Sequence, residues 1–92
     1  MARPKKKRTI KLVQENRYFA PTHKMMIQEE LTLYPEEIEV IYLKDLKNLD
    51  QKEAASQMSI SQSTFHRILK QARKKIARSI IEGHALKTNE KD

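Results

Sequence analysis

Hydrophobic residues recur at helical spacing through the second half of the chain and predict three helices. The first begins at Pro35, a residue that suits the first turn of a helix, and it continues through Leu46. Its buried stripe consists of apolar residues at helical spacing: Ile38, Ile41 and Leu46, flanked by Val40, Tyr42 and Leu43. We expect this helix to pack across the other two and support them.

The other two helices are expected to meet at a tight turn. Asp50 is placed to cap a helix over 51–58, with Glu53 in the capping-box position. Ser59 and Ile60 form the turn. The helix pair over residues 50–70 resembles the DNA-binding helix-turn-helix, in which the first turn residue is usually glycine. The chain departs from that pattern at Ser59, and the resemblance implies a positive φ there, at a cost of roughly 1–2 kcal/mol for a residue with a Cβ. Where the two helices must touch, the residues are apolar or small: Ala54, Ala55, Met58, Ile60, Phe65 and Ile68.

The last helix is expected to be long. Ser61 is placed to cap it, so that it starts at Gln62. It continues to Glu82, because Gly83 is a typical C-terminal stop. About 21 residues give a helix roughly 30 Å long. One side of it is apolar: Phe65, Ile68, Leu69, Ala72, Ile76 and Ile80.

The N-terminal half predicts short strands and loops. Residues 9–13 alternate weakly between apolar and polar side chains and suggest a strand, with 31–33 as its pairing partner. Tyr18 and Phe19 are expected to form an apolar lid on the core. Residues 84–88 are expected to add a further short strand.

Composition limits the class of protein. Ninety-two residues allow one small domain, and a hydrophobic fraction of 38% beside a charged fraction of 34% implies a modest core under an ionic surface. Cysteine is absent, which excludes a disulfide framework and a cysteine zinc site. No apolar run is long enough to cross a membrane and no signal peptide is evident, so we expect a cytoplasmic protein.

The net charge of +7 is unevenly distributed. Residues 1–24 carry eight Lys/Arg and one acid (+7), whereas residues 25–58 carry three Lys/Arg and eight acids (−5). Residues 59–83 carry six Lys/Arg and one acid (+5), and residues 84–92 are neutral. Positive charge is thus concentrated on the N-terminal arm and on the last helix, which favours a polyanionic partner.

Two resemblances follow from these motifs. The helix pair over residues 50–70, DQKEAASQMSISQSTFHRILK, resembles the DNA-binding helix-turn-helix, and residues 34–78 resemble the fourth region of bacterial sigma factors. The whole chain resembles a family of small prokaryotic proteins described as predicted DNA-binding proteins. That likeness rests on MARPKKKR, RYFAP, EVIYLKDLKNLDQKEAA and ARKKIARSIIEGHAL. These resemblances imply sequence-specific binding of double-stranded DNA, in the manner of a small transcriptional regulator.

The predicted fold is therefore mainly α. A three-helix core contains a helix-turn-helix with a long C-terminal recognition helix, accompanied by short N-terminal strands or an extended arm. We expect a flexible basic arm over 1–8, a single DNA-binding domain over 9–86 and a loose tail over 87–92.

In a helix-turn-helix the start of the second helix reaches base edges, while its N-terminus and flanking donors reach phosphates. The residues expected to contact bases are those left facing outward: Gln62, Ser63, His66, Arg67 and Lys70. The expected phosphate contacts are hydroxyls at the helix start and basic side chains: Ser61, Thr64, Lys74, Arg3, Lys5, Lys6, Lys7 and Arg8.

Other partners remain open at this stage. The basic arm would also serve RNA or nonspecific nucleic-acid binding. Alternatively, the protein is a protein-interaction adaptor whose helix pair docks on a transcription complex, a role that the acidic helix over 35–46 could serve. The distal part of the last helix is more apolar than a small core needs. A second copy could cover it, forming a homodimer through Ile76, Ile80 and Ile81; alternatively, the N-terminal strand and loop cover it.

Catalysis and metal binding are not expected. The sequence has no glycine-rich phosphate loop and no Ser/His/Asp constellation. Its three histidines, His23, His66 and His84, are too scattered to form a metal site. No cofactor and no small-molecule substrate is implied.

Overall fold

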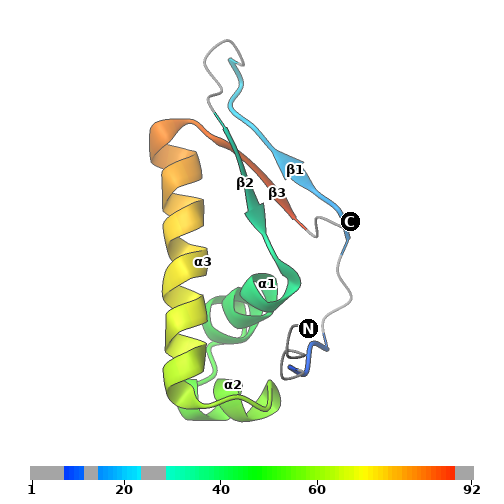
Figure 1. Ribbon diagram of the computed structural model, residues 1–92, viewed down its shortest axis with the longest axis vertical. Helices are drawn as coiled ribbons and strands as arrows, with labels where there is room; N and C mark the ends of the chain where they lie inside the picture. The colour runs from blue at the N-terminus through cyan, green and yellow to red at the C-terminus, as the bar shows by residue number, and fades with distance from the viewer. Residues whose placement is uncertain (1–7, 12–14, 24–28, 89–92) are drawn as a thin grey trace, which may run out of the picture.

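The computed structural model describes residues 8–11, 15–23 and 29–88. Helices dominate, as predicted, and a small three-stranded sheet accompanies them (Figure 1). The elements follow in the order β1 (Tyr18–Phe19), β2 (Glu30–Leu33), α1 (Pro35–Ile41), a π-helical turn (Tyr42–Leu46), α2 (Gln51–Gln57), α3 (Gln62–Glu82) and β3 (Ala85–Thr88). α3 runs along one side of the molecule, with the sheet beside its C-terminal half and α1 and α2 beside its N-terminal half.

The helix ends lie where the capping residues predicted them. The Glu53 backbone N–H donates to Asp50 Oδ1 over 2.8 Å at the start of α2, although the Glu53 carboxylate accepts from Gln57 instead of completing a capping box. The Thr64 N–H donates to Ser61 Oγ over 3.1 Å at the start of α3. Gly83 ends α3 in the left-handed conformation, with φ +78°.

The turn between α2 and α3 adopts the strained backbone that its sequence suggested. Ser59 has φ +59°, and its neighbour Ile60 donates its N–H to the carbonyl of Ala55. The Ser59 hydroxyl also lies 3.1 Å from the hydroxyl of Thr9. A residue with a Cβ is therefore held in a conformation that favours glycine.

The core lies where the three helices meet. Apolar residues from all of them are buried together with two from the sheet: Leu33, Val40, Leu43, Ala54, Ala55, Met58, Phe65, Ile68, Leu69, Ala72 and Leu86. Ala54 and Ala55 present little bulk, which lets α2 approach α3 closely. The predicted contacts between α2 and α3 are thus confirmed, with Ile60 partly buried beside them.

Leu46 is an exception, since 74% of it is exposed. α1 passes into a π-helical turn at Tyr42, where the N–H of Lys47 bonds the carbonyl five residues back. Such a turn takes more residues than an α-helical turn, so the helical phase that places Val40 and Leu43 inside no longer applies to Leu46. The prediction that Leu46 continues the buried stripe was wrong.

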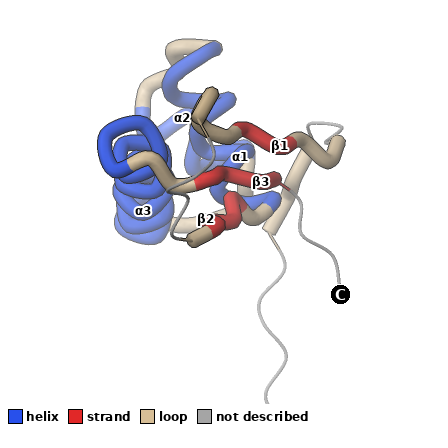
Figure 2. Tube along the Cα trace, turned by 90° about the horizontal axis from the view of Figure 1, so that it is seen from above, coloured by secondary structure: helices blue, strands red, loops and turns tan. Residues whose placement is uncertain are grey.

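The sheet has the order β1-β3-β2, so the last strand lies in the middle (Figure 2). β3 pairs with β2 in parallel, with Leu31 opposite Leu86, and with β1 antiparallel, with Phe19 opposite Leu86. Residues 31–33 are in a strand, as predicted, but their partner is β3. Residues 84–88 are also confirmed as containing a strand, which continues to Thr88 and thus beyond the predicted domain end at 86.

The strand predicted over 9–13 is not formed at Thr9, Ile10 or Lys11, and the remaining two positions lie outside the described residues. These residues bond to helices instead: the Thr9 N–H donates to the Met58 carbonyl, and the Lys11 N–H donates to Glu39 Oε2 over 3.3 Å. Tyr18 and Phe19 form β1 and are about half exposed, so the expected lid is also wrong.

Within the described ranges, no helix is long and apolar enough to span a membrane. The same ranges contain no cluster of three or more histidine or acidic side chains that could hold a metal ion.

The strain at Ser59 can be measured with two substitutions. Ser59→Ala and Ser59→Gly both remove the hydroxyl contact with Thr9, but only glycine relaxes the positive φ. We expect Ser59→Gly to be more stable than Ser59→Ala by about 1 kcal/mol, which is a melting temperature about 4–8 °C higher for a domain of this size. Thermal unfolding followed by circular dichroism measures the difference. Equal stability of the two variants would contradict a strained turn.

Candidate nucleic-acid interface

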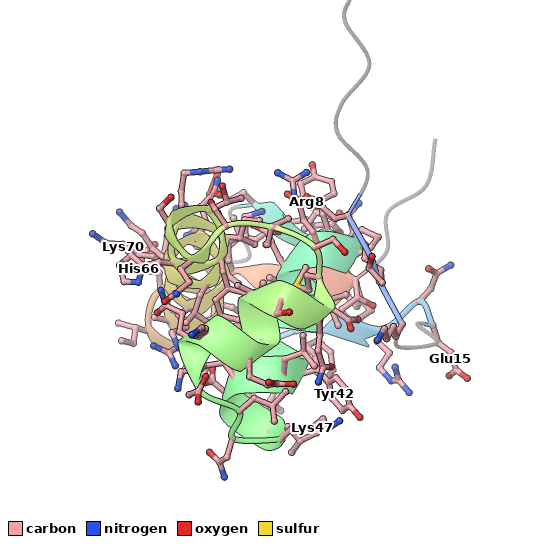
Figure 3. The ribbon with its side chains drawn as sticks, turned by 90° about the horizontal axis from the view of Figure 1, so that it is seen from below. Arg8, Glu15, Tyr42, Lys47, His66 and Lys70 are labelled. Atoms are coloured by element: carbon pink, nitrogen blue, oxygen red, sulfur yellow. The ribbon has the colours of Figure 1, made fainter. Side chains whose placement is uncertain are left out.

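The outward side of α3 carries the residues that were predicted to contact bases. Gln62, Ser63, His66, Arg67 and Lys70 are all exposed, as is Lys74, while Phe65, Ile68 and Leu69 between them are buried. His66 and Lys70 point away from the body of the molecule (Figure 3). Because Gln62, His66, Lys70 and Lys74 are four residues apart, they follow one line along the helix. We call these six exposed residues the basic face of α3.

The charge of the basic face is not neutralised by neighbours. Residues 62–81 contain no Asp or Glu. Among the described residues, Arg67, Lys70 and Lys74 take part in no ion pair within 4.0 Å. Their cationic groups are therefore available to an external anion.

Two other basic residues of α3 have a structural role. The Arg73 guanidinium donates through Nε to Asp45 Oδ2 over 3.2 Å, and this hydrogen bond raises the pKa of Arg73. Lys75 turns inward, where its Nζ donates over 2.8 Å both to Glu37 Oε1 and to the carbonyl of Thr32. Arg73 thus fastens α3 to the π-helical turn, and Lys75 fastens it to α1 and β2; together they set the direction in which the basic face points.

In the Glu37–Lys75 ion pair, the carboxylate is buried. Glu37 is 3% exposed, and its carboxylate also accepts the N–H of Tyr34 over 2.9 Å. The Lys75 ammonium lies 4.7 Å from the centre of the Tyr34 ring, within the range of a cation–π interaction. This network is not evident from the sequence, because its two charged members are 38 positions apart.

The remaining acids of α1 and its π-helical turn are also engaged within the chain. Glu36 pairs with Arg8 over 3.0 Å, Glu39 is 1% exposed beside the N–H of Lys11, and Asp45 pairs with Arg73. Of the eight acids over 25–58, Glu37 and Glu39 are thus buried, and Glu36 and Asp45 are paired with basic side chains of the same chain.

Hydroxyls gather at the start of α3. Ser61 Oγ accepts from the Thr64 N–H, donates to Thr64 Oγ1 over 2.9 Å and lies 3.2 Å from Ser63 Oγ. Both residues predicted to hold a phosphate, Ser61 and Thr64, are therefore at the helix N-terminus, where their hydroxyls already serve the cap. The backbone N–H groups of the first turn that the cap leaves without a partner inside the helix remain suited to an anion.

The basic arm is described only at its end. Arg8 belongs to the arm predicted over 1–8, but it is held against α1 by its ion pair with Glu36. Arg3, Lys5, Lys6 and Lys7 lie outside the described residues.

Gln51 is a candidate that sequence reasoning overlooked. This first residue of α2 donates through Nε2 to the carbonyl of Gln62 over 3.1 Å, so it links the starts of the two helices. Lys52 next to it is exposed. Their position directly after the Asp50 cap was the available signal, because a helix N-terminus attracts phosphate.

Comparison with known proteins gives a family. The family model described as "Protein of unknown function DUF134" matches residues 1–92. A "UPF0251 protein" of Halothermothrix orenii is 48% identical over 88 residues, which cover 95% of this chain and 65% of that relative. A "UPF0251 protein" of Clostridium tetani is 43% identical, with 95% and 60% covered. This chain thus spans about three fifths of the length of these bacterial relatives. No solved structure matches it.

The buried pair that orients α3 gives a stability prediction. Lys75→Met leaves the Glu37 carboxylate buried without its charge partner, and we expect a loss of about 3 kcal/mol in the free energy of unfolding. Arg73→Met breaks the solvent-exposed pair with Asp45 and is expected to lower the free energy of unfolding by at most about 1 kcal/mol. Urea unfolding of the two variants beside the parent chain measures both values. Equal losses would show that Glu37–Lys75 has no special part in holding α3.

Proposed function

We propose that this chain binds double-stranded DNA through the basic face of α3. The chain belongs to the family described as "Protein of unknown function DUF134". In this proposal α2, the turn at Ser59 and α3 act as a helix-turn-helix similar to the fourth region of sigma factors. The chain would serve as a small transcriptional regulator, with α3 in the major groove.

The observation that carries the proposal is the separation of roles along α3. Over residues 62–75, Phe65, Ile68, Leu69 and Ala72 are buried, Arg73 and Lys75 are paired with acids, and Arg67, Lys70 and Lys74 are left exposed without a described ion pair. A helix that only packed against its neighbours would have no need of this arrangement. A polyanion supplies the missing negative charge.

Base recognition would come from the first two turns of α3. The Gln62 amide can form two hydrogen bonds with adenine at N6 and N7, and the Arg67 guanidinium can do the same with guanine at O6 and N7. Each such pair discriminates against the wrong base by roughly 1–3 kcal/mol. Ser63, His66 and Lys70 lie beside them on the same face.

Phosphate contacts would come from the two helix starts and from the arm. The first turn of α3, capped by Ser61, and Lys52 at the start of α2 offer N–H groups and positive charge to one strand of the duplex. Lys74 extends the contact along α3, and the basic residues of the N-terminal segment add charge that carries no sequence information.

The structure of α1 does not support the alternative that the protein is a protein-interaction adaptor. An acidic docking helix needs its carboxylates at the surface, but Glu37 and Glu39 are buried and Glu36 is paired with Arg8. RNA remains the rival partner, because the cations of α3 would attract either nucleic acid.

Selection of binding sites from a random DNA duplex library tests the proposal. We expect the parent chain to enrich one motif, and the double variant Arg67→Ala, Lys70→Ala to lose it. The matched control is Arg17→Ala, Lys47→Ala, which removes the same charge from exposed positions off the basic face and should enrich the parent motif. Loss of the motif in both double variants, or in neither, would contradict reading by α3. Stronger binding to structured RNA of equal charge would point to RNA.

Salt dependence tests the electrostatic part separately. If six to ten phosphates are neutralised, affinity should fall roughly 10³–10⁵-fold between 50 and 200 mM salt. Lys70→Ala should lower the slope of log affinity against log salt by about 1. Fluorescence anisotropy with a labelled duplex measures both, and an affinity that stays constant over this range would exclude the proposed contact.

A further inference from the structure

The chain at Thr9 is attached to the turn between α2 and α3. The Thr9 N–H donates to the carbonyl of Met58 over 3.1 Å, and the Thr9 hydroxyl lies 3.1 Å from the hydroxyl of Ser59. Ser59 is the residue with φ +59°, and α3 begins three positions later at Gln62. Thr9 is therefore held against the segment that leads into the basic face.

Two further contacts hold this part of the chain against α1. Arg8 pairs with Glu36 over 3.0 Å, and the Lys11 N–H donates to Glu39 Oε2 over 3.3 Å. Residues 8–11 form no regular secondary structure, so their contacts with α1 and with the turn determine where they lie. We call residues 8–11 the anchor.

The anchor directly follows a strongly basic segment. Residues 1–7 contain Arg3, Lys5, Lys6 and Lys7 and no acid. Because the anchor is bound to α1 and to the turn, the point at which this segment joins the folded domain is fixed. Viewed from below, His66 and Lys70 point to the left and Arg8 lies at the upper edge, so the anchor is not opposite the basic face (Figure 3).

We propose that the anchor, with Thr9 as its positioning residue, directs the lysines of residues 1–7 to phosphates at one flank of the DNA site bound by α3. This inference rests on the proposed function and adds to it the place of the arm on the duplex. It also separates Arg8 from the phosphate contacts that the sequence suggested for it, because Arg8 holds the anchor through Glu36.

The length of the basic segment limits its reach. Seven extended residues span at most about 25 Å. Phosphates along one DNA strand are about 3.4 Å apart, so the segment covers roughly seven of them from its fixed start. A fixed start also raises the effective concentration of the lysines at those phosphates. The flank beside the turn is therefore favoured over the flank on the far side of α3.

Directed cleavage of DNA locates the segment. The chain contains no cysteine, so Lys5→Cys provides a single attachment point for an iron chelate that generates hydroxyl radicals. The labelled protein is bound to a duplex that carries one selected site for α3, and strand cleavage is mapped. We expect cleavage at one flank only, within roughly seven nucleotides of the site. Equal cleavage of both flanks, or no cleavage at either, would overturn the inference.

The role of the anchor is tested by loosening it. In the Lys5→Cys protein, Thr9→Val together with Glu36→Ala removes the hydroxyl contact and the ion pair but keeps every positive charge of the segment. We expect the preference for one flank to be lost. Loss of Glu36 makes the protein more positive, so a weaker contact at the preferred flank would have no explanation in net charge.

Two controls accompany this variant. Glu30→Ala removes the same charge from β2, and Thr9→Ser keeps the hydroxyl, so both should retain cleavage at one flank. Circular dichroism is used to check that the proteins are folded. If the double variant fails to fold, Thr9→Val alone replaces it and must still broaden the cleavage. A loosened anchor that leaves the pattern unchanged would contradict a positioning role for Thr9.

The salt dependence of binding shows whether the segment contacts phosphates. Lys5→Ala with Lys6→Ala should lower the slope of log affinity against log salt by about 2, while the selected motif is retained because phosphate contacts carry no sequence information. Arg17→Ala with Lys47→Ala removes the same charge outside the segment and should leave the slope unchanged. Equal slopes in the two double variants would count against the arm contact.

These results separate the two proposals. If the parent chain selects a motif but the cleavage has no preferred flank, the inference about the anchor fails and the proposed function of α3 stands. If the parent chain binds no duplex, both proposals fail.

Discussion

The buried ion pair between Glu37 and Lys75 is the constraint on which the rest of the structure depends. It connects α1 with the middle of α3 and, through the carbonyl of Thr32, with β2. A carboxylate that is 3% exposed needs a positive partner and hydrogen bonds, and here it obtains both from Lys75 and the Tyr34 N–H. Because α3 is the element along which the others are arranged, fixing its rotation also fixes which of its residues face outward.

That rotation sorts the charges of the chain. The acids of α1 and its π-helical turn are turned toward Arg8, Lys75 and Arg73, whereas Arg67, Lys70 and Lys74 are exposed without a described ion pair. The sequence already shows this segregation as alternating charged blocks, but the pairing of the acids with Arg8, Lys75 and Arg73 is visible only in three dimensions. Internal neutralisation of the acids leaves a local excess of positive charge, which is the physical basis of the proposed DNA contact.

Local signals in the sequence were sufficient for much of the fold. Asp50, Ser61 and Gly83 specify helix ends through interactions within a few residues, so these ends could be predicted. The positive φ of Ser59 was expected from the likeness to a helix-turn-helix. Two strands, at 31–33 and 84–88, could also be predicted, but their pairing could not, because β3 follows a 21-residue helix and the pairing of Leu31 with Leu86 joins distant segments. The same distance concealed the Glu37–Lys75 pair. The prediction that Leu46 is buried was wrong for a different reason, since a π-helical turn changes the helical phase. At the candidate site, helical spacing predicted which side chains face outward, but the link from Gln51 to Gln62 required the packing of α2 on α3.

The central claim is that one face of α3 meets DNA, and amide chemical-shift mapping tests it most directly. A uniformly nitrogen-15-labelled chain is titrated with a selected duplex while two-dimensional nuclear magnetic resonance spectra are recorded. The account predicts that the largest shifts occur at residues 59–74, strongest at Ser63, His66 and Arg67, with little change at β1 and β3. Shifts concentrated on the π-helical turn or on the sheet, with the amides of α3 unmoved, would contradict it.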